Sequence, residues 1–244
     1  MHLCIDIGNT FVKYGLFSGN DLLKFGKENA YTNRLINDLL DQNAEIEAII
    51  ISSVRNSSEL NIKDFEEVFT LILEDSTPLP IQNDYNTKET LGKDRIALAV
   101  AACSEHPNKN VLVVDIGTCM TFDLVTSEHV YKGGIISPGI QMRLDAMHQG
   151  TARLPQITLD HFENISMLGS STELCMISGA LNGLKLELEG VIAAFEKQYE
   201  DLIVMITGGD YKHFENQLKN AIFADPNLVL RGLNQILSYN LEKK

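Results

Sequence analysis

A short strand pattern that ends in an acidic residue and a glycine occurs twice in this chain, and it constrains the fold more than any other feature. The first copy is Leu3-Cys4-Ile5 followed by Asp6-Ile7-Gly8-Asn9-Thr10, and the second is Val111–Val114 followed by Asp115-Ile116-Gly117-Thr118. We call Asp6–Thr10 the first corner and Asp115–Thr118 the second corner. Lys13 follows the first corner in the next predicted strand. The repeat indicates two related halves that face each other across a nucleotide.

The length and charge of the chain limit what it can do. A chain of 244 residues allows one large domain or two smaller ones. Its net charge of −13 repels phosphate backbones, so we expect no binding to nucleic acid or to an anionic membrane. No apolar run approaches the roughly 20 residues that span a bilayer, and we expect no secretion signal. Its four cysteines form no Cys-x-x-Cys pair, so we expect reduced thiols and a cytoplasmic protein.

The first half has a strand-rich beginning followed by helices. Strand patterns cover residues 2–7, 12–17, 22–25, 48–52 and 70–73. Helical patterns cover residues 33–42, 57–68 and 94–105, and residues 74–90 are expected to form an exposed loop. His106-Pro107-Asn108 ends the last of these helices because proline interrupts helical hydrogen bonding. The sequence therefore predicts two domains, residues 1–108 and 109–244.

The second half repeats this plan. Strands are predicted at residues 111–115, 120–125, 129–136 and 202–206, with a short one near Phe223. Helices are predicted at residues 139–148, 171–199, 211–220 and 227–239. Gly179, Gly183 and Gly190 fall inside the long helix, where we expect them to permit close packing. Cys103 and Cys175 have apolar helical neighbours and are expected in the core. This order indicates α/β halves with mixed sheets.

The first corner has the composition of a phosphate site. A tight turn with little side-chain bulk lets backbone N–H groups approach phosphate oxygens. Lys13 adds a positive charge, and Asp6 is a suitable oxygen ligand for Mg²⁺. The alternative is an ordinary hairpin whose turn is stabilised by Asp6. The recurrence of the pattern at Asp115 favours the phosphate interpretation.

Gly92-Lys93-Asp94-Arg95 at a predicted helix start is the best catalytic candidate. Asp94 has the chemistry of a general base for an attacking hydroxyl, and Arg95 offers a planar fork for a carboxylate or phosphate. The alternative is a capped helix with an incidental ion pair, which the pattern alone favours.

Two glycine-rich strand ends are further candidates. Thr207-Gly208-Gly209-Asp210 offers backbone donors to a phosphate or an adenosine, or is a plain turn. Gly133–Gly139 brings backbone close to a ligand or simply turns a corner. A Walker-type loop is absent, and no histidine pair has the spacing of a zinc site.

In order and spacing, these motifs resemble type III pantothenate kinase over nearly the whole chain. The resemblance is carried by Asp6–Thr10 with Lys13, Gly92-x-Asp94-Arg95, Asp115-x-Gly117-Thr118, Gly133-Gly134-x-Ile136-x-Pro138-Gly139, Thr151-Ala152-x-Leu154-Pro155 and Thr207-Gly208-Gly209. It implies the acetate-and-sugar-kinase/actin-like superfamily fold, with two ribonuclease-H-like domains containing mixed five-stranded sheets flanked by helices. It also implies ATP-dependent phosphorylation of pantothenate, an alcohol acceptor, as the first step of coenzyme A biosynthesis.

The resemblance further implies cofactors, partners and residue roles. The cofactors are ATP, Mg²⁺ and a monovalent cation (K⁺ or NH4⁺), and the expected assembly is a homodimer with the substrate site near the interface. Asp94 is the implied base, Asp115 the monovalent-cation ligand, and Asp6 a Mg²⁺ ligand, directly or through water. The implied ATP contacts are Asp6, Ile7, Gly8, Asn9, Thr10, Phe11, Val12, Lys13 and Thr118. The implied pantothenate contacts are Tyr85, Gly92, Lys93, Asp94, Arg95 and, reaching from the partner subunit, Thr172.

Four residues depart from the family pattern, and two other functions remain open. Cys119, Ile96-Ala97 and Cys175 replace residues that are more usual in the family, which leaves the detailed shape of the pocket open. One alternative function is another small-molecule kinase of the superfamily, and the other is a non-catalytic regulator on the same fold. The short spacing between motifs and the Gly-x-Asp-Arg segment count against the first alternative. The retained Asp6, Lys13, Asp94 and Asp115 count against the second.

Overall fold

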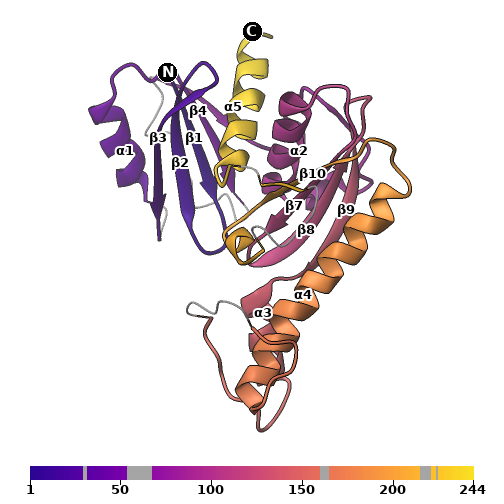
Figure 1. Cartoon of the computed structure of the whole chain (residues 1–244). Helices are drawn as coiled ribbons and strands as arrows, with labels where there is room; N and C mark the ends of the chain where they lie inside the picture. The colour runs from indigo at the N-terminus through magenta and orange to yellow at the C-terminus, as the bar shows by residue number, and fades with distance from the viewer. Residues whose placement is uncertain (30–31, 54–67, 160–164, 215–220, 224) are drawn as a thin grey trace. The chain divides into compact units, whose positions relative to one another are not determined.

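The chain divides into two compact units. A computed structural model describes residues 1–29, 32–53, 68–159, 165–214, 221–223 and 225–244 (Figure 1). Unit 1 comprises residues 1–108, 125–133 and 227–244, and unit 2 comprises residues 109–124 and 134–226. The two domains predicted to meet between residues 108 and 109 stay a prediction.

Unit 1 is built on a five-stranded mixed sheet. Its strands are β1 (His2–Ile7), β2 (Val12–Ser18), β3 (Asp21–Glu28), β4 (Ala48–Ser53) and β5 (Phe69–Ile72), in the order β3-β2-β1-β4-β5. β1, β2 and β3 form the predicted antiparallel meander, whereas β4 and β5 run parallel to their neighbours. The β1–β2 connection is the first corner, so the sheet fixes that corner at the end of its central strand.

Helices complete unit 1, and alternation along the strands sorts the side chains between the two faces. Leu3, Ile5 and Ile7 of β1 pack with Ile36 and Leu39 of α1 (Asn33–Gln42). The intervening residues of β1 point to the other face, where His2 contacts Asn234 of α5 (Leu228–Leu241). Helix α2 (Lys93–Glu105) packs closely on α5, because a Cβ atom on Gly232 would lie 1.8 Å from the carbonyl oxygen of Ala97.

Unit 2 repeats the strand order of unit 1. The strands of the second half are β7 (Val111–Ile116), β8 (Cys119–Val125), β9 (Val130–Pro138), β10 (Ile203–Thr207) and β11 (Ala221–Phe223). The complete sheet has the order β11-β10-β7-β8-β9-β6, so the second corner follows its central strand β7. β6 (Gln82–Asn83) is a sixth strand, which pairs with Val130 and Tyr131 of β9 within unit 1. The predicted five strands are therefore present, and β6 extends their sheet.

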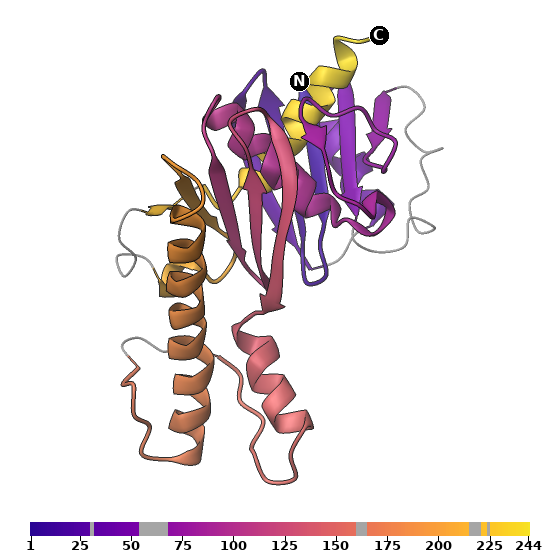
Figure 2. The same ribbon diagram turned by 90° about the vertical axis from the view of Figure 1, so that its right-hand side faces the viewer.

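Two helices flank the core of unit 2. α3 (Ile140–Gln149) lies beside the long helix α4 (Thr172–Glu196), as Figures 1 and 2 both show. The core combines the apolar strands β7 and β8 with the buried side of α4, which includes Met176, Ile177 and Leu184. Among the described residues, the short 3-10 helix η3 (Lys88–Thr90) lies in unit 1 and η4 (Tyr211–His213) lies in unit 2.

Several local predictions need correction. The 74–90 segment is not wholly a loop, because it contains β6 and η3. α4 runs through its three glycines, but an added Cβ at any of them would meet nothing within 4 Å among the described residues, so they do not serve close packing within the chain. Cys103 is buried as predicted, whereas Cys175 is exposed because it lies on the outer side of the first turns of α4. Residues 57–67 of the predicted helix 57–68 and the end of 211–220 lie outside the described residues.

Candidate functional site

The first corner is a tight turn at the end of β1. The backbone N–H of Gly8 donates to the carbonyl oxygen of Phe11 over 3.0 Å, and a Cβ atom on Gly8 would lie 3.2 Å from that oxygen. This close approach explains the small residue, and it leaves Asn9 and Thr10 exposed at the turn. Lys13 pairs across the strands with Asp6, so a cation and a carboxylate share the base of the corner.

Asp6 is a buried carboxyl group with an altered pKa. Its pKa is raised from 3.8 to about 6, first by burial and then by the negative charge of Asp94, whereas Lys13 and a hydrogen bond from Ser52 lower it. Ser52 Oγ donates to Asp6 Oδ1 over 3.1 Å from the neighbouring strand β4. The structure therefore brings Asp6 and Asp94 into electrostatic contact within unit 1. A buried carboxyl group whose ionisation is opposed by a second negative charge attracts a cation, because the cation relieves that cost.

The predicted base lies in the first turn of α2. Asp94 Oδ1 accepts a 2.8 Å hydrogen bond from the backbone N–H of Arg95, and Asp94 remains partly exposed. A Cβ atom on Gly92 would lie 2.5 Å from Asp94 Oδ1, so glycine leaves room for this rotamer. A carboxylate at a helix start is also stabilised by the helix dipole. Asp94 thus presents a partly exposed carboxyl group at the start of α2.

The other predicted pantothenate residues of unit 1 form two groups. Arg95 is buried, and its guanidinium carbon lies 5.7 Å from the centre of the Tyr85 ring, so these two predicted residues do come together. Gly133 adopts a φ of 94°, and a Cβ atom added to it would lie 3.1 Å from Tyr85. The absence of a side chain at Gly133 therefore leaves room for the Tyr85 ring. The ammonium group of Lys93 instead forms an ion pair with the carboxylate of Asp75.

The second corner is packed by two glycine-rich segments of unit 2. Gly139 N–H donates to the carbonyl oxygen of Thr118 over 3.1 Å, and a Cβ on Gly139 would lie 2.1 Å from the Gly117 carbonyl oxygen. Gly208, with a φ of 108°, approaches Asp115 so closely that its added Cβ would lie 2.4 Å from Asp115 Oδ1. Both glycine-rich strand ends therefore shape this corner, where Asp115 is half-buried and Thr118 is exposed.

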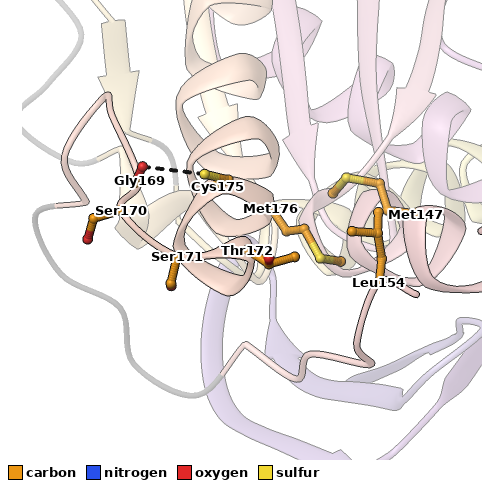
Figure 3. Close-up of a pocket in the computed structure, with 8 residues that line it drawn as sticks. All are labelled: Met147, Leu154, Gly169, Ser170, Ser171, Thr172, Cys175 and Met176. Atoms are coloured by element: carbon orange, nitrogen blue, oxygen red, sulfur yellow. Dashed lines mark hydrogen bonds between the residues drawn. The ribbon is translucent and has the colours of Figure 1, made fainter.

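Thr172 lies elsewhere in unit 2, at the start of α4. Ser171 caps this helix, because the N–H of Leu174 donates to its Oγ over 3.2 Å. Thr172 is exposed and lines an open hollow, in which Met147, Leu154 and Met176 lie together on one side (Figure 3). Cys175 Sγ donates a weak hydrogen bond to the carbonyl oxygen of Gly169 across this hollow.

Sequence reasoning missed Ser52 as a neighbour of Asp6, and it singled out Thr207 only as part of a glycine-rich strand end and not as a neighbour of Asp115. Ser52 is in register with Asp6 between β1 and β4, and Thr207 is in register with Asp115 between β7 and β10. Both hydroxyl residues are buried. The available signal was the repeated plan itself, since each half has an apolar strand that ends in Ser or Thr and runs parallel to the central strand.

Metal ligands are few in the part of the chain that the structure describes. No cluster of three or more His, Cys, Asp or Glu side chains suited to a metal ion occurs there. Asp6 still fits the role of a single carboxylate ligand, since Mg²⁺ usually combines one or two carboxylates with phosphates and water. Asp115 offers one carboxyl group for the expected monovalent cation. Among the same residues, no helix is both long and apolar enough to cross a lipid bilayer.

Comparison with known proteins places the chain among named relatives. A family model for type III pantothenate kinase matches residues 2–194. The type III pantothenate kinase of Christiangramia forsetii is 43% identical over 244 residues, which cover 98% of this chain and 99% of the relative. The protein of the same name from Bacteroides fragilis is 42% identical over 246 residues, covering 98% of each chain.

Solved structures show the same fold. A conserved Campylobacter jejuni protein assigned to the Baf family of transcriptional activators is 24% identical, with a TM-score of 0.64 over 98% of this chain and 99% of that one. A glucokinase from an Antarctic psychrotroph is 14% identical, with a TM-score of 0.55 over 98% of each chain. At these identities the likeness concerns fold alone. The predicted actin-like α/β fold class is confirmed.

Proposed function

Because the chain belongs to the type III pantothenate kinase family, we propose that it transfers the γ-phosphoryl group of ATP to pantothenate. The product is 4'-phosphopantothenate, and the reaction is the first step of coenzyme A biosynthesis. The structural observation that carries the proposal is the pairing of buried Asp6, beside a phosphate-type turn, with accessible Asp94 on α2. A kinase needs this combination of an anion-binding turn and a base for the acceptor hydroxyl.

ATP is assigned to the first corner. The backbone of Ile7–Thr10, with Phe11 and Val12, presents N–H groups to its phosphates, and Lys13 offsets their charge. Thr118 of the second corner is the remaining proposed ATP contact. Asp6 would hold Mg²⁺, directly or through water, and the bound ion would supply positive charge next to the phosphates. The raised pKa of Asp6 supports that assignment, because a nearby cation relieves the cost of ionising a buried carboxyl group.

Pantothenate is assigned to the Tyr85 and Gly92–Arg95 group. Asp94 orients the primary hydroxyl of pantothenate and accepts its proton as the hydroxyl oxygen attacks the γ-phosphorus of ATP. The guanidinium of Arg95 offers a planar fork to the pantothenate carboxylate. The ring of Tyr85, which Arg95 approaches, is assigned to the same substrate site. Lys93 contributes to this segment through its backbone, since its side chain pairs with Asp75.

Three further assignments complete the proposal. Asp115 binds the monovalent cation, K⁺ or NH4⁺, with carboxylate oxygen. The enzyme works in the cytoplasm as a homodimer, in which Thr172 reaches the substrate site of the partner subunit. Exposed apolar side chains close to Thr172, which include Met167 and Leu168, support the presence of a contact surface there.

Two alternatives remain outcomes of the assay. Another small-molecule kinase of the superfamily would use an acceptor such as glucose in place of pantothenate. A non-catalytic regulator would release no ADP with either acceptor. The accessible carboxyl group of Asp94 counts against the non-catalytic regulator, because a binding module needs no base at that position.

The direct test replaces the proposed base. Asp94→Asn keeps the size of the side chain and an oxygen acceptor for the Arg95 N–H, but it removes the proton acceptor. We expect turnover of pantothenate to fall on the order of 10²–10⁴-fold, with ATP binding retained. ADP release with pantothenate or glucose as acceptor measures turnover, and calorimetry measures ATP binding. Near-normal turnover of pantothenate by the variant would contradict the assignment of the base.

A further inference from the structure

A row of polar side chains crosses four adjacent strands of unit 1. Lys27 on β3 is in register with Lys13 on β2, Lys13 with Asp6 on β1, and Asp6 with Ser52 on β4. Residues directly opposite each other on neighbouring strands project from the same face of a sheet. Lys27 therefore shares its face with the proposed phosphate-binding Lys13 and Mg²⁺-binding Asp6.

Lys27 also contacts the first corner itself. Its ammonium nitrogen lies 3.4 Å from the centre of the Phe11 ring, and Phe11 accepts the hydrogen bond that closes the turn. The Phe11 ring thus holds the Lys27 ammonium group beside the turn. The remaining N–H donors of Lys27 stay available, since the residue is exposed.

The two lysines lack carboxylate partners at hydrogen-bond distance. Within the described residues, neither Lys13 nor Lys27 forms a salt bridge, although the charge of Asp6 acts on Lys13. Like charges directly opposite each other on adjacent strands destabilise a sheet. The facing pair of Lys13 and Lys27 therefore costs stability, and it lies beside an anion-binding turn. Such a pair fits a ligand with several negative groups in a row, and the triphosphate of ATP is a ligand of this kind.

We propose that Lys27 is a second ATP-binding cation, which contacts the triphosphate together with Lys13. This inference rests on the proposed ATP site at the first corner. Lys27 lies two strands away from Asp6, and this position suits a role in holding the nucleotide in place. Lys27 therefore contributes to ATP affinity and leaves proton transfer at Asp94 unchanged.

The test compares Lys27→Met with Lys24→Met in the full-length chain. Lys24 is an exposed lysine on the same strand, but it is in register with Leu16, which packs into the core on the opposite face. We expect Lys27→Met to raise the KM for ATP about tenfold, the size of one charge-assisted hydrogen bond. Its kcat and its KM for pantothenate should change less than twofold. Lys24→Met should leave all three values unchanged.

Two further readouts separate phosphate contact from a structural role. Lys27→Arg should restore most of the ATP affinity, because it keeps both the charge and the contact with Phe11. The KM for ATP should rise less steeply with NaCl concentration in Lys27→Met than in the wild type, because a screened charge has been removed. An equal salt dependence, or an ATP KM within twofold of the wild type, would overturn the proposal.

MgATP binding measured by calorimetry without pantothenate keeps this test independent of the proposed reaction. If the wild type binds MgATP but releases no ADP with pantothenate, the proposed function fails, and weaker binding by Lys27→Met still supports Lys27. If the wild type phosphorylates pantothenate and both proteins bind MgATP equally, Lys27 fails and the function stands. Loss of MgATP binding by the wild type itself would contradict both.

Discussion

At the scale of single residues, the charge of Asp6 connects stability to function. Asp6 is buried, and both its burial and the charge of Asp94 oppose its ionisation. The same ionised form is the one that would hold Mg²⁺. A residue whose functional state costs folding free energy is common at active sites, because pKa values are tuned there by burial and by like charges.

Asp6→Asn tests this cost through stability. Folding raises the pKa of Asp6 from 3.8 to about 6, so its contribution is fully present below about pH 4 and is lost as the pH rises through 6. A shift of about two units corresponds to about 3 kcal/mol. Asp6→Asn does not ionise, and its amide oxygen still accepts the hydrogen bond from Ser52. In the absence of nucleotide and divalent ions, we expect the variant to be more stable than the wild type at pH 8 and similar to it at pH 4.

Urea unfolding of both proteins between pH 4 and pH 8 measures the difference. The comparison isolates Asp6, since all other titrating groups are shared. A constant difference in unfolding free energy across that range would show that Asp6 does not titrate as described.

At the scale of helices and strands, close packing occurs at glycines that the sequence alone did not single out. Gly232 of α5 lies against the backbone of α2 at Ala97, whereas Gly179 of α4 has open space where a Cβ would be. The two positions are both helical, so their substitution by alanine separates packing from helix propensity.

Gly232→Ala and Gly179→Ala should shift stability in opposite directions. The new methyl group at position 232 would lie 1.8 Å from the Ala97 carbonyl oxygen, so we expect a loss of about 1–3 kcal/mol as α2 and α5 separate. At position 179 the methyl group meets nothing within 4 Å, and alanine favours the helix by up to about 1 kcal/mol. Thermal unfolding of both variants measures these changes. Equal stability of the two variants would contradict the packing of α2 on α5.

The strands and helices that could be predicted are those whose own residue pattern determines their secondary structure. The buried strands β1 and β7 are continuous apolar runs, and the long helix α4 has an apolar side that persists through its glycines. β6 escaped prediction because Gln82-Asn83 is polar and is held as a strand only by pairing with β9. The exposure of Cys175 likewise depends on which side of α4 meets the core.

The candidate site could be predicted in its residues but not in its interactions. Asp6 and Asp94 each stand out locally, at a strand end and a helix start. Their mutual effect on the pKa of Asp6 arises only when the fold brings them together. Ser52 and Lys27 were missed for the same reason, since each acquires its role from register with a neighbouring strand.

At the scale of the whole molecule, the proposed homodimer links assembly to the substrate site. Leu168 is 86% exposed and Met167 is 62% exposed, just before the α4 start that carries Thr172. Large apolar side chains exposed in this way commonly mark an interaction surface.

Leu168→Asp tests the proposed assembly. The wild type should have about twice the mass of a 27.1 kDa chain in light scattering, and the variant should shift towards the mass of one chain. Since Thr172 is proposed to reach the partner subunit, we expect dissociation to raise the KM for pantothenate. Leu23→Asp is the matched control, because Leu23 is 59% exposed in unit 1. A wild type with the mass of one chain would contradict the dimer.

The central claim is that this chain phosphorylates pantothenate with ATP in a reaction that needs a monovalent cation. The most direct measurement is ADP release by the wild type with pantothenate, with K⁺ present or replaced by a larger organic cation, and with the product identified by its mass. We predict rapid release of ADP and formation of 4'-phosphopantothenate when K⁺ is present, and little of either when it is replaced. ADP release with glucose but not with pantothenate, or none with either acceptor, would contradict the account.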